Sequence, residues 1–215
     1  MRAKKENGFA SGKAPKRSQG PSLSTAPRPA GQVRIIGGQW KRTPIAVPDK
    51  PGLRPSGDRV RETVFNWLGH LVGDFGAVRG LDMFAGSGAL GFELASRGSR
   101  RVVLIERDAQ LARALRALKD KLKADAIEVM QADALAAAAR LPAEFDLIFL
   151  DPPFAAGIEA KALTAAIKVL APDGLIYLES PAVFSAEAAA AAGLEIVRQG
   201  QAGRVAFHLL RCAKP

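Results

Sequence analysis

The residues best suited to chemistry form the tetrapeptide Asp151-Pro152-Pro153-Phe154, which directly follows the apolar run 145–150. Asp151 offers an acceptor carboxylate and Phe154 an aromatic face. Neither proline has an N–H, so the segment presents acceptors on an extended backbone. We interpret it as a pocket in which the exocyclic amine of a nucleobase donates to Asp151 and to the Pro152 carbonyl while the ring stacks on Phe154. Considered without the rest of the chain, the same residues fit an ordinary proline turn equally well.

A glycine-rich turn lies upstream, where Gly86, Gly88 and Gly91 form a G-x-G-x-x-G pattern after a predicted strand and before a predicted helix. This context indicates a nucleotide ligand, and Glu106, at the end of the next strand, is placed to hold ribose hydroxyls. An NAD site would share these features. Asp82 argues against NAD, because a carboxylate repels a pyrophosphate and attracts a cationic amino-acid group.

S-adenosyl-L-methionine fits this turn better than NAD, since it carries an ammonium and a sulfonium and no phosphate. Its ribose and adenine would contact Glu106 and the strand end at Asp133-Ala134. We therefore expect S-adenosyl-L-methionine as the cofactor, and we predict no metal site.

The elements that position these residues alternate between strands and helices. Strands are predicted at 78–84, 101–106, 127–132, 145–150, 174–178, 194–198 and 205–211, and helices at 89–97, 109–123, 134–140, 159–170 and 186–192. This alternation predicts an α/β fold with a mainly parallel, doubly wound sheet over residues 79–215. The acids then gather where the parallel strands end, which is the edge at which such sheets bind ligands.

An N-terminal extension, residues 33–78, precedes the sheet. We expect a short hairpin over 33–47 that turns at or near Gly37-Gly38, a loop rich in proline and glycine at 48–55, and a helix that begins near Ser56 or Asp58. The apolar stripe of this helix comprises Val60, Val64, Trp67, Leu68 and Leu71. Residues 1–32 have too few large apolar side chains to offset the entropy of ordering, and we predict a disordered basic tail.

The formal charge of +10 lies entirely before residue 80. Residues 1–79 hold 15 Lys and Arg against 5 acids, whereas residues 80–215 hold 16 against 16. Such asymmetry favours a polyanionic partner, although solubility alone would also explain it. The single Cys212 fits a reducing compartment, and no run approaches the roughly 18 apolar residues of a membrane span. We expect a cytoplasmic protein without a membrane partner.

The pattern Asp82-x-Phe84-x-Gly86-x-Gly88, followed by the Asp-Pro-Pro-Phe segment, resembles the class I S-adenosylmethionine-dependent N-methyltransferases. Three further segments, 34–38, 53–55 and 58–68, are similar to the bacterial 16S ribosomal RNA guanine-N2 methyltransferase (RsmD-type) family, and the match covers about 33–211. The resemblance implies a Rossmann-like sheet of seven strands in the order 3-2-1-4-5-7-6, with strand seven antiparallel.

The resemblance also implies which residues act. Catalysis would lie at Asp151, Pro152, Pro153 and Phe154, and the cofactor would contact Asp82, Phe84, Ala85, Gly86, Ser87, Gly88, Glu106, Arg107, Asp133 and Ala134. The extension would cap the cofactor and bind RNA through Arg34, Lys41, Arg42, Arg54, Arg59 and Arg61, although a solvated surface would explain Arg59 and Arg61 equally well.

The implied reaction is methyl transfer to the N2 amine of a guanine in 16S ribosomal RNA, by the resemblance guanine 966. We expect a monomer that acts on an assembling 30S particle. The chain departs from the family pattern in its basic tail, at Gly57 and at Phe207. Three alternatives stay open: a DNA or RNA adenine-N6 methyltransferase, an NAD-dependent oxidoreductase, and a non-catalytic RNA-binding assembly factor.

Overall fold

The computed structural model describes residue 1 and residues 31–47, 57–153 and 157–214. Several sequence predictions lie outside these residues. They concern the disordered tail, the loop at 48–55, an N-cap at Ser56, and the roles of Arg54 and Phe154.

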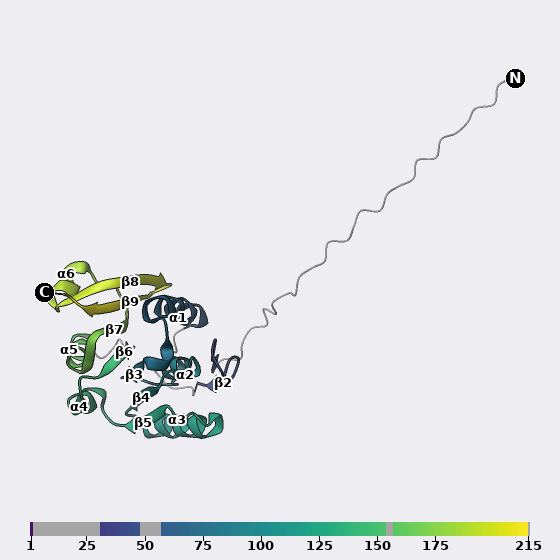
Figure 1. Ribbon diagram of the computed structural model, residues 1–215, viewed down its shortest axis with the longest axis horizontal. Coiled ribbons are helices and arrows are strands. Elements are labelled where there is room, and N and C mark those ends of the chain that lie inside the picture. Colours follow the sequence, from purple (N-terminus) through teal and green to yellow (C-terminus); the bar gives the residue numbers. More distant parts are fainter. Residues whose placement is uncertain (2–30, 48–56, 154–156, 215) are drawn as a thin grey trace.

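A seven-stranded sheet forms the centre of the molecule (Figure 1). Its order is β5-β4-β3-β6-β7-β9-β8, and β9 runs antiparallel to both of its neighbours. This order is the predicted one, so the predicted α/β class and the antiparallel strand are confirmed. The strands are β3 Arg79–Asp82, β4 Arg101–Glu106, β5 Ile127–Gln131, β6 Phe145–Leu150, β7 Leu170–Ser180, β8 Leu194–Ala202 and β9 Val205–Cys212.

Helices cover both faces of the sheet. Figure 1 shows α1, α2 and α3 on one side and α4, α5 and α6 on the other. Each side has its own buried apolar cluster, because the parallel strands are apolar on both faces. The helices are α1 Asp58–Val72, α2 Ala89–Ser96, α3 Ala109–Leu122, α4 Ala134–Ala138, α5 Glu159–Val169 and α6 Ala186–Ala191, with a 3-10 turn, η1, at Phe75–Ala77.

The last three strands are longer than the sequence predicts. Strand β7 extends from Leu170 to Ser180 and β8 from Leu194 to Ala202, whereas apolar runs mark only 174–178 and 194–198. Polar residues continue the pairing, since the ladder is made by the backbone and needs no apolar side chains. As a result Glu179 and Ser180 belong to a strand in the interior of the sheet.

The N-terminal hairpin pairs β1 Gln32–Arg34 with β2 Pro44–Ala46 in antiparallel register. The hairpin is confirmed, but Gly38 does more than turn the chain. A Cβ on Gly38 would lie 1.8 Å from the Ser96 carbonyl oxygen, and its φ is +75°. The glycine therefore lets the hairpin loop approach the end of α2, where Gln39 N–H donates to the same carbonyl at 2.8 Å.

Helix α1 packs its apolar face on the sheet, where the rings of Phe65 and Phe149 lie 5.9 Å apart. The helix begins at Asp58, as predicted, and Gly57 occupies the N-cap position. Leu71 belongs to the predicted apolar stripe, but it lies in the last turn of the helix and is 40% exposed.

A buried polar network joins the extension to α2. Glu93 has no exposed surface and accepts hydrogen bonds from the backbone N–H of Ile36 (2.6 Å) and of Gly37 (2.8 Å). The Arg97 guanidinium also donates to it at 2.9 Å. Arg61 approaches it to 3.7 Å from α1. These contacts fix the hairpin and α1 against the sheet domain.

Candidate active site

Three acidic residues gather where neighbouring strands of the sheet end. Asp82 is the last residue of β3, Asp151 follows the last residue of β6, and Glu179 lies next to the end of β7. Because β3, β6 and β7 are adjacent and parallel, these ends share one edge of the sheet. The structure thus brings together two acids that the sequence singles out and one that it does not.

The glycine turn between β3 and α2 has a shape that other residues would disrupt. Gly86 and Gly88 have φ values of +53° and +80°, which L-residues with a side chain rarely adopt. Gly91 serves close packing instead, since a Cβ there would lie 2.1 Å from the Leu104 side chain. The backbone of the turn can therefore approach both a ligand and the sheet.

Asp82 lies beneath this turn and is only 2% exposed. Its carboxylate accepts a hydrogen bond from Gly91 N–H at 3.2 Å. Burial raises the pKa of Asp82 from 3.8 to about 7, and hydrogen bonds from the backbone of Gly91 and Phe84 offset part of this effect. A cationic ligand would stabilise the ionised form of such a carboxyl group, because its positive charge compensates for the hydration that burial removes.

Glu106, at the end of β4, contacts the turn directly. One carboxylate oxygen accepts from Gly86 N–H at 2.9 Å, and the other accepts from Asp108 N–H at 2.7 Å. The side chain is partly exposed, and the neighbouring Arg107 is exposed. The acid therefore links the glycine turn to the start of α3 and keeps further lone pairs for a ligand hydroxyl.

The remaining predicted cofactor contacts lie around this turn and on the next strand. Asp133 follows β5 and caps α4, since its Oδ1 accepts from Leu135 N–H and Ala136 N–H, each at 3.0 Å. Ala134 is buried and Asp133 is exposed. Within the turn, Phe84 is partly buried and Ala85 N–H donates to the Ile105 carbonyl at 3.0 Å.

Asp151 has two acidic neighbours, Glu179 and Asp82. Burial raises its pKa well above the usual range, and the nearby charges of Glu179 and Asp82 raise it further. Pro152 is buried and Pro153 is exposed, and Asp151 is partly exposed at the edge of the sheet.

Sequence reasoning missed Glu179 and Tyr177. Glu179 is 4% exposed and accepts a hydrogen bond from the Tyr177 hydroxyl at 2.7 Å in the interior. Burial and the Glu179 carboxylate raise the pKa of Tyr177 well above its usual value. The signal was present, because Glu179 closes an apolar run just as Asp82 and Asp151 do.

The basic residues predicted to contact RNA differ in their exposure. Lys41, Arg42 and Arg59 are exposed, and the Arg34 side chain is 56% exposed while it pairs with Asp58 at 3.1 Å. Arg61 is completely buried. It donates to Asp58 at 2.8 Å and to the Arg34 carbonyl at 2.9 Å. The prediction of a surface RNA contact for Arg61 is therefore wrong, because the side chain joins α1 to β1 inside the protein.

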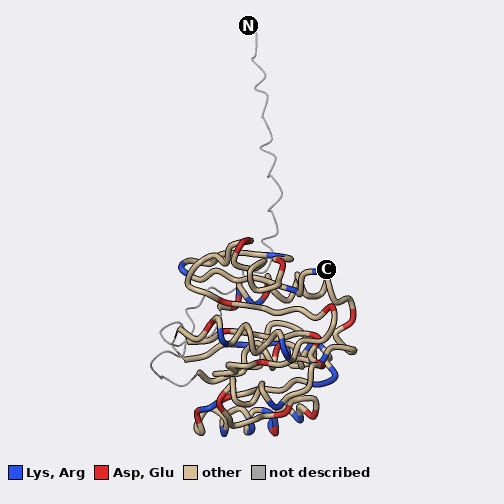
Figure 2. Tube along the Cα trace, turned by 90° about the vertical axis from the view of Figure 1, so that its left-hand side faces the viewer, with Lys and Arg blue, Asp and Glu red and all other residues tan. Residues whose placement is uncertain are grey.

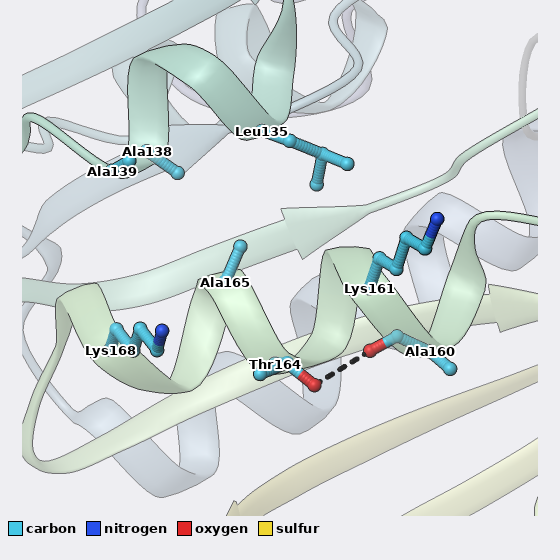
Figure 3. Close-up of a pocket in the computed structure, with 8 residues that line it drawn as sticks. All are labelled: Leu135, Ala138, Ala139, Ala160, Lys161, Thr164, Ala165 and Lys168. Atoms are coloured by element: carbon cyan, nitrogen blue, oxygen red, sulfur yellow. Dashed lines mark hydrogen bonds between the residues drawn. The ribbon is translucent and has the colours of Figure 1, made fainter.

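Two pockets lie on either side of α5. The first, of about 380 Å³, is bordered by Leu135 and Ala138 of α4 and by Lys161 and Lys168 of α5 (Figure 3). The second, of about 740 Å³, lies between α5 and α6 and includes Phe184. Neither lining includes Asp82, Asp151 or Glu179.

The charges of the sheet domain are mixed. Figure 2 shows blue and red segments interspersed along its lower end, where α3 lies. Five Lys or Arg and one acid occur between residues 112 and 123, and Asp108 and Asp125 flank them. The basic excess of the chain therefore does not lie on the sheet domain as a whole.

Residues 33–211 match the protein family described as Conserved hypothetical protein 95. The chain belongs to this family. The match begins at the hairpin and ends in β9, so it includes the extension, the glycine turn and the Asp-Pro-Pro segment. The family resemblance found from the sequence motifs is confirmed.

Curated relatives carry an informative name. "Ribosomal RNA small subunit methyltransferase D" of Escherichia coli strain K12 is 45% identical over 129 residues, which cover 60% of this chain and 64% of that protein. The protein of the same name from Haemophilus influenzae is 42% identical over 133 residues, which cover 60% of this chain and 67% of that protein. The alignment thus spans less than two thirds of the Escherichia coli relative.

Solved structures extend the likeness over more of the fold. The Escherichia coli protein yhhF superimposes with a TM-score of 0.72 and 36% identity, covering 85% of this chain and 98% of that one. A structure from Pyrococcus horikoshii, described as that of a putative RNA methyltransferase, is 16% identical, covers 78% of this chain and 91% of that one, and shares the fold with a TM-score of 0.64. The sheet is that of the class I methyltransferases. In the described part of this chain, no helix has the length and apolarity to cross a membrane.

Proposed function

We propose that this protein is an S-adenosyl-L-methionine-dependent 16S ribosomal RNA (guanine-N2)-methyltransferase. One observation carries the proposal: Asp151, which begins the Asp-Pro-Pro segment, lies at the same sheet edge as Asp82 and the glycine turn. A cofactor held at the turn would then have its reactive group close to a substrate held at Asp151. The names of the curated relatives support this class of reaction.

The residues at the turn fit the proposed cofactor. Asp82 would pair with the ammonium group of its amino-acid part, which would favour the charged form of a buried carboxyl group. The Glu106 carboxylate would accept from the ribose hydroxyls, and Asp133 and Ala134 would border the adenine. When bound, the cofactor supplies an electrophilic methyl group on a sulfonium.

Asp151 would prepare the amine for transfer. The lone pair of the guanine N2 is delocalised into the ring, so the nitrogen is a poor nucleophile. Hydrogen bonds from its two protons to the Asp151 carboxylate and to the Pro152 carbonyl would localise electron density on it. A new N–C bond then forms as the S–C bond breaks, its electron pair stays on sulfur, and one N–H proton leaves.

Positioning would supply much of the rate enhancement. Holding two reactants in line is worth roughly 7–11 kcal/mol in favourable systems. The buried row of Phe149 and Tyr177 beneath the acids gives the site a rigid floor, since their rings pack 6.0 Å apart. Phe154 would stack on the base after it leaves its helical stack.

The exposed basic residues of the extension would contact the RNA. Arg34, Lys41, Arg42 and Arg59 carry charges that can neutralise phosphates, and the predicted contact by Arg54 adds to them. We propose 16S ribosomal RNA in an assembling 30S particle as the substrate and a monomer as the active form.

An adenine-N6 methyltransferase would use the same kind of pocket, so the experiment must identify the product. The purified protein is incubated with methyl-labelled S-adenosyl-L-methionine and with 30S particles or naked 16S RNA from cells that lack this modification. Nucleoside analysis should detect N2-methylguanosine in the wild-type reaction and none with Asp151→Ala.

The alternatives predict different results. N6-methyladenosine as the product would replace the proposed function with the adenine enzyme. Binding of NAD in preference to S-adenosyl-L-methionine in calorimetry would overturn the cofactor assignment. RNA binding without any methyl transfer would favour the assembly factor.

A further inference from the structure

We propose that Glu179 is a positioning residue for the methyl transfer: its carboxylate, beside Asp151 at the edge of the sheet, makes Asp151 a stronger acceptor for the proton that the amine releases. This inference rests on the proposed function and adds a residue outside the Asp-Pro-Pro segment. It gives a role in the reaction to a buried acid at the edge of the sheet.

Strand pairing places Glu179 beside Asp151. The parallel register of β6 and β7 pairs Phe149 with Tyr177 and Leu150 with Leu178. Asp151, directly after β6, and Glu179 come next after the last of these pairs, so we infer that both side chains leave the same face of the sheet. Neighbouring strands lie about 4.8 Å apart, which places the two acids in direct electrostatic contact.

The Glu179 side chain is held in place from below. Tyr177, two residues earlier on the same face, donates its hydroxyl proton to Glu179 Oε1 at 2.7 Å. A phenol that donates to a carboxylate makes a short, charge-assisted bond. Tyr177 is itself fully buried and packs its ring against Phe149. Glu179 therefore has a fixed position relative to the end of β6.

Other charged groups surround the pair. Asp82 faces it from β3, and Glu106 acts on Asp82 from β4. Helix α1 contributes the buried Arg61, whose charge acts on Tyr177, and α2 contributes Glu93, which Arg61 approaches to 3.7 Å. Arg61 also pairs with Asp58. Arg61 thus supplies a positive charge on the α1 side of these groups.

This arrangement has a chemical purpose in the reaction. The amine nitrogen becomes positively charged as the N–C bond forms, and it must release a proton to become the neutral methylamine. A carboxylate of ordinary basicity is a weak acceptor for that proton. Burial and the Glu179 charge both raise the pKa of Asp151, so that Asp151 accepts the proton more readily. The proton then passes to water at the exposed sheet edge.

Glu179→Gln tests the inference, because glutamine keeps the size and the acceptor for Tyr177 but removes the charge. Activity requires ionised Asp151, so it falls as the pH drops through the pKa of that group. Without the Glu179 charge this pKa is lower, and the acid limb of kcat should move to lower pH by roughly one unit. At pH 8 kcat should fall by up to about tenfold, because a base weakened by one pKa unit loses at most that factor, and the KM for RNA should not change.

Two further variants separate this role from a structural one. Tyr177→Phe removes the hydroxyl but leaves the Glu179 charge, so it should lower kcat without moving the acid limb to lower pH. Glu128→Gln removes an acid that is 53% exposed and pairs with Arg101, far from the site, and should leave the profile unchanged. Calorimetry with S-adenosyl-L-methionine checks that each variant is folded.

The outcomes are distinguishable. If the wild-type protein transfers no methyl group, the proposed function fails before Glu179 is tested. If the wild type is active and the acid limb of kcat against pH lies at the same pH for Glu179→Gln as for the wild type, the positioning role is wrong, however large the loss of rate. If Glu179→Gln does not fold, a limb shifted to lower pH in Tyr177→Phe would overturn the inference, and a lower kcat with an unshifted limb would support it.

Discussion

Gly86 N–H donates a hydrogen bond to the carboxylate of Glu106 at 2.9 Å, so the residue expected to hold a ribose also holds the glycine turn. The two residues are twenty positions apart: Gly86 lies in the turn after β3, and Glu106 is the last residue of the adjacent strand β4. In the proposed cofactor site, one side chain would therefore couple the shape of the turn to the recognition of the ligand.

Substitution of Glu106 should separate these two tasks. Glu106→Gln keeps an acceptor for Gly86 N–H and should weaken cofactor binding moderately. Glu106→Ala loses both tasks and should weaken it by about 1.5–3 kcal/mol, roughly ten- to a hundredfold. Titration calorimetry with S-adenosyl-L-methionine measures both. Equal affinities for the wild type and the alanine variant would show that Glu106 contacts no part of the cofactor.

Asp82 should make the stability of the protein depend on pH. Its pKa is about 7 in the folded chain and 3.8 in the ordinary state, so between these values the folded state binds more protons. The free energy of unfolding therefore decreases as the pH rises through this window. Asp82→Asn should stabilise the protein at pH 8, by at most about 4 kcal/mol, and change little at pH 4.

Urea denaturation of wild type and Asp82→Asn at the two pH values measures this difference. The same variant should lose affinity for S-adenosyl-L-methionine at pH 8, because the ammonium group loses its partner. A stability gap that is the same at both pH values would contradict the raised pKa.

Arg61 and Arg59 provide a matched comparison on one helix. Arg61→Met removes a fully buried guanidinium from Asp58 and Glu93, which keep Arg34 and Arg97 as partners. The loss of stability should therefore approach the roughly 3–5 kcal/mol that breaking a buried ion pair typically costs. Arg59→Met changes an exposed residue and should cost less than about 0.5 kcal/mol. Chemical denaturation compares them.

For RNA binding, the Arg59 variant should be affected more than the Arg61 variant. Arg59→Met should weaken binding to 16S RNA and reduce the salt dependence by about one phosphate contact. A folded Arg61→Met variant should keep the wild-type salt dependence. A large loss of stability in Arg59→Met would place that side chain in the interior instead.

The basic segment before the hairpin should add affinity without specificity. It holds seven Lys and Arg against Glu6. A truncation should keep Gly31, whose carbonyl accepts from Val47 N–H at 2.6 Å. Removing residues 2–30 should flatten the plot of log affinity against log salt by on the order of two units. Parallel plots with equal intercepts would show that the segment takes no part in RNA binding.

The sequence predicted the sheet because its strands are apolar runs separated by glycine and by amphipathic helices. The glycine turn and the acids Asp82 and Asp151 were found for the same reason, since polar residues at the ends of apolar runs stand out. Glu179 has the same kind of position. It was missed because the predicted strand stopped at Leu178, before the polar residues that continue its ladder.

The environment of Arg61 could not be predicted in this way. An arginine in an amphipathic helix is usually solvated, and helical spacing alone did not place it on the buried face. Its burial depends on Asp58 within the same helix and on Glu93, which is 32 positions away in α2. Such a pairing is a tertiary contact and leaves no local pattern in the sequence.

The hydrogen bond from Ile36 to Glu93 also constrains the order of events during synthesis. It joins residues 57 positions apart, and the hairpin that carries Ile36 leaves the ribosome first. The hairpin can pair β1 with β2 as soon as residue 46 has emerged, but its docking surface exists only after the chain has been made through α2. At about 5–20 residues per second, the hairpin, which we propose binds ribosomal RNA, therefore waits for several seconds on the translating ribosome before it can dock on α2.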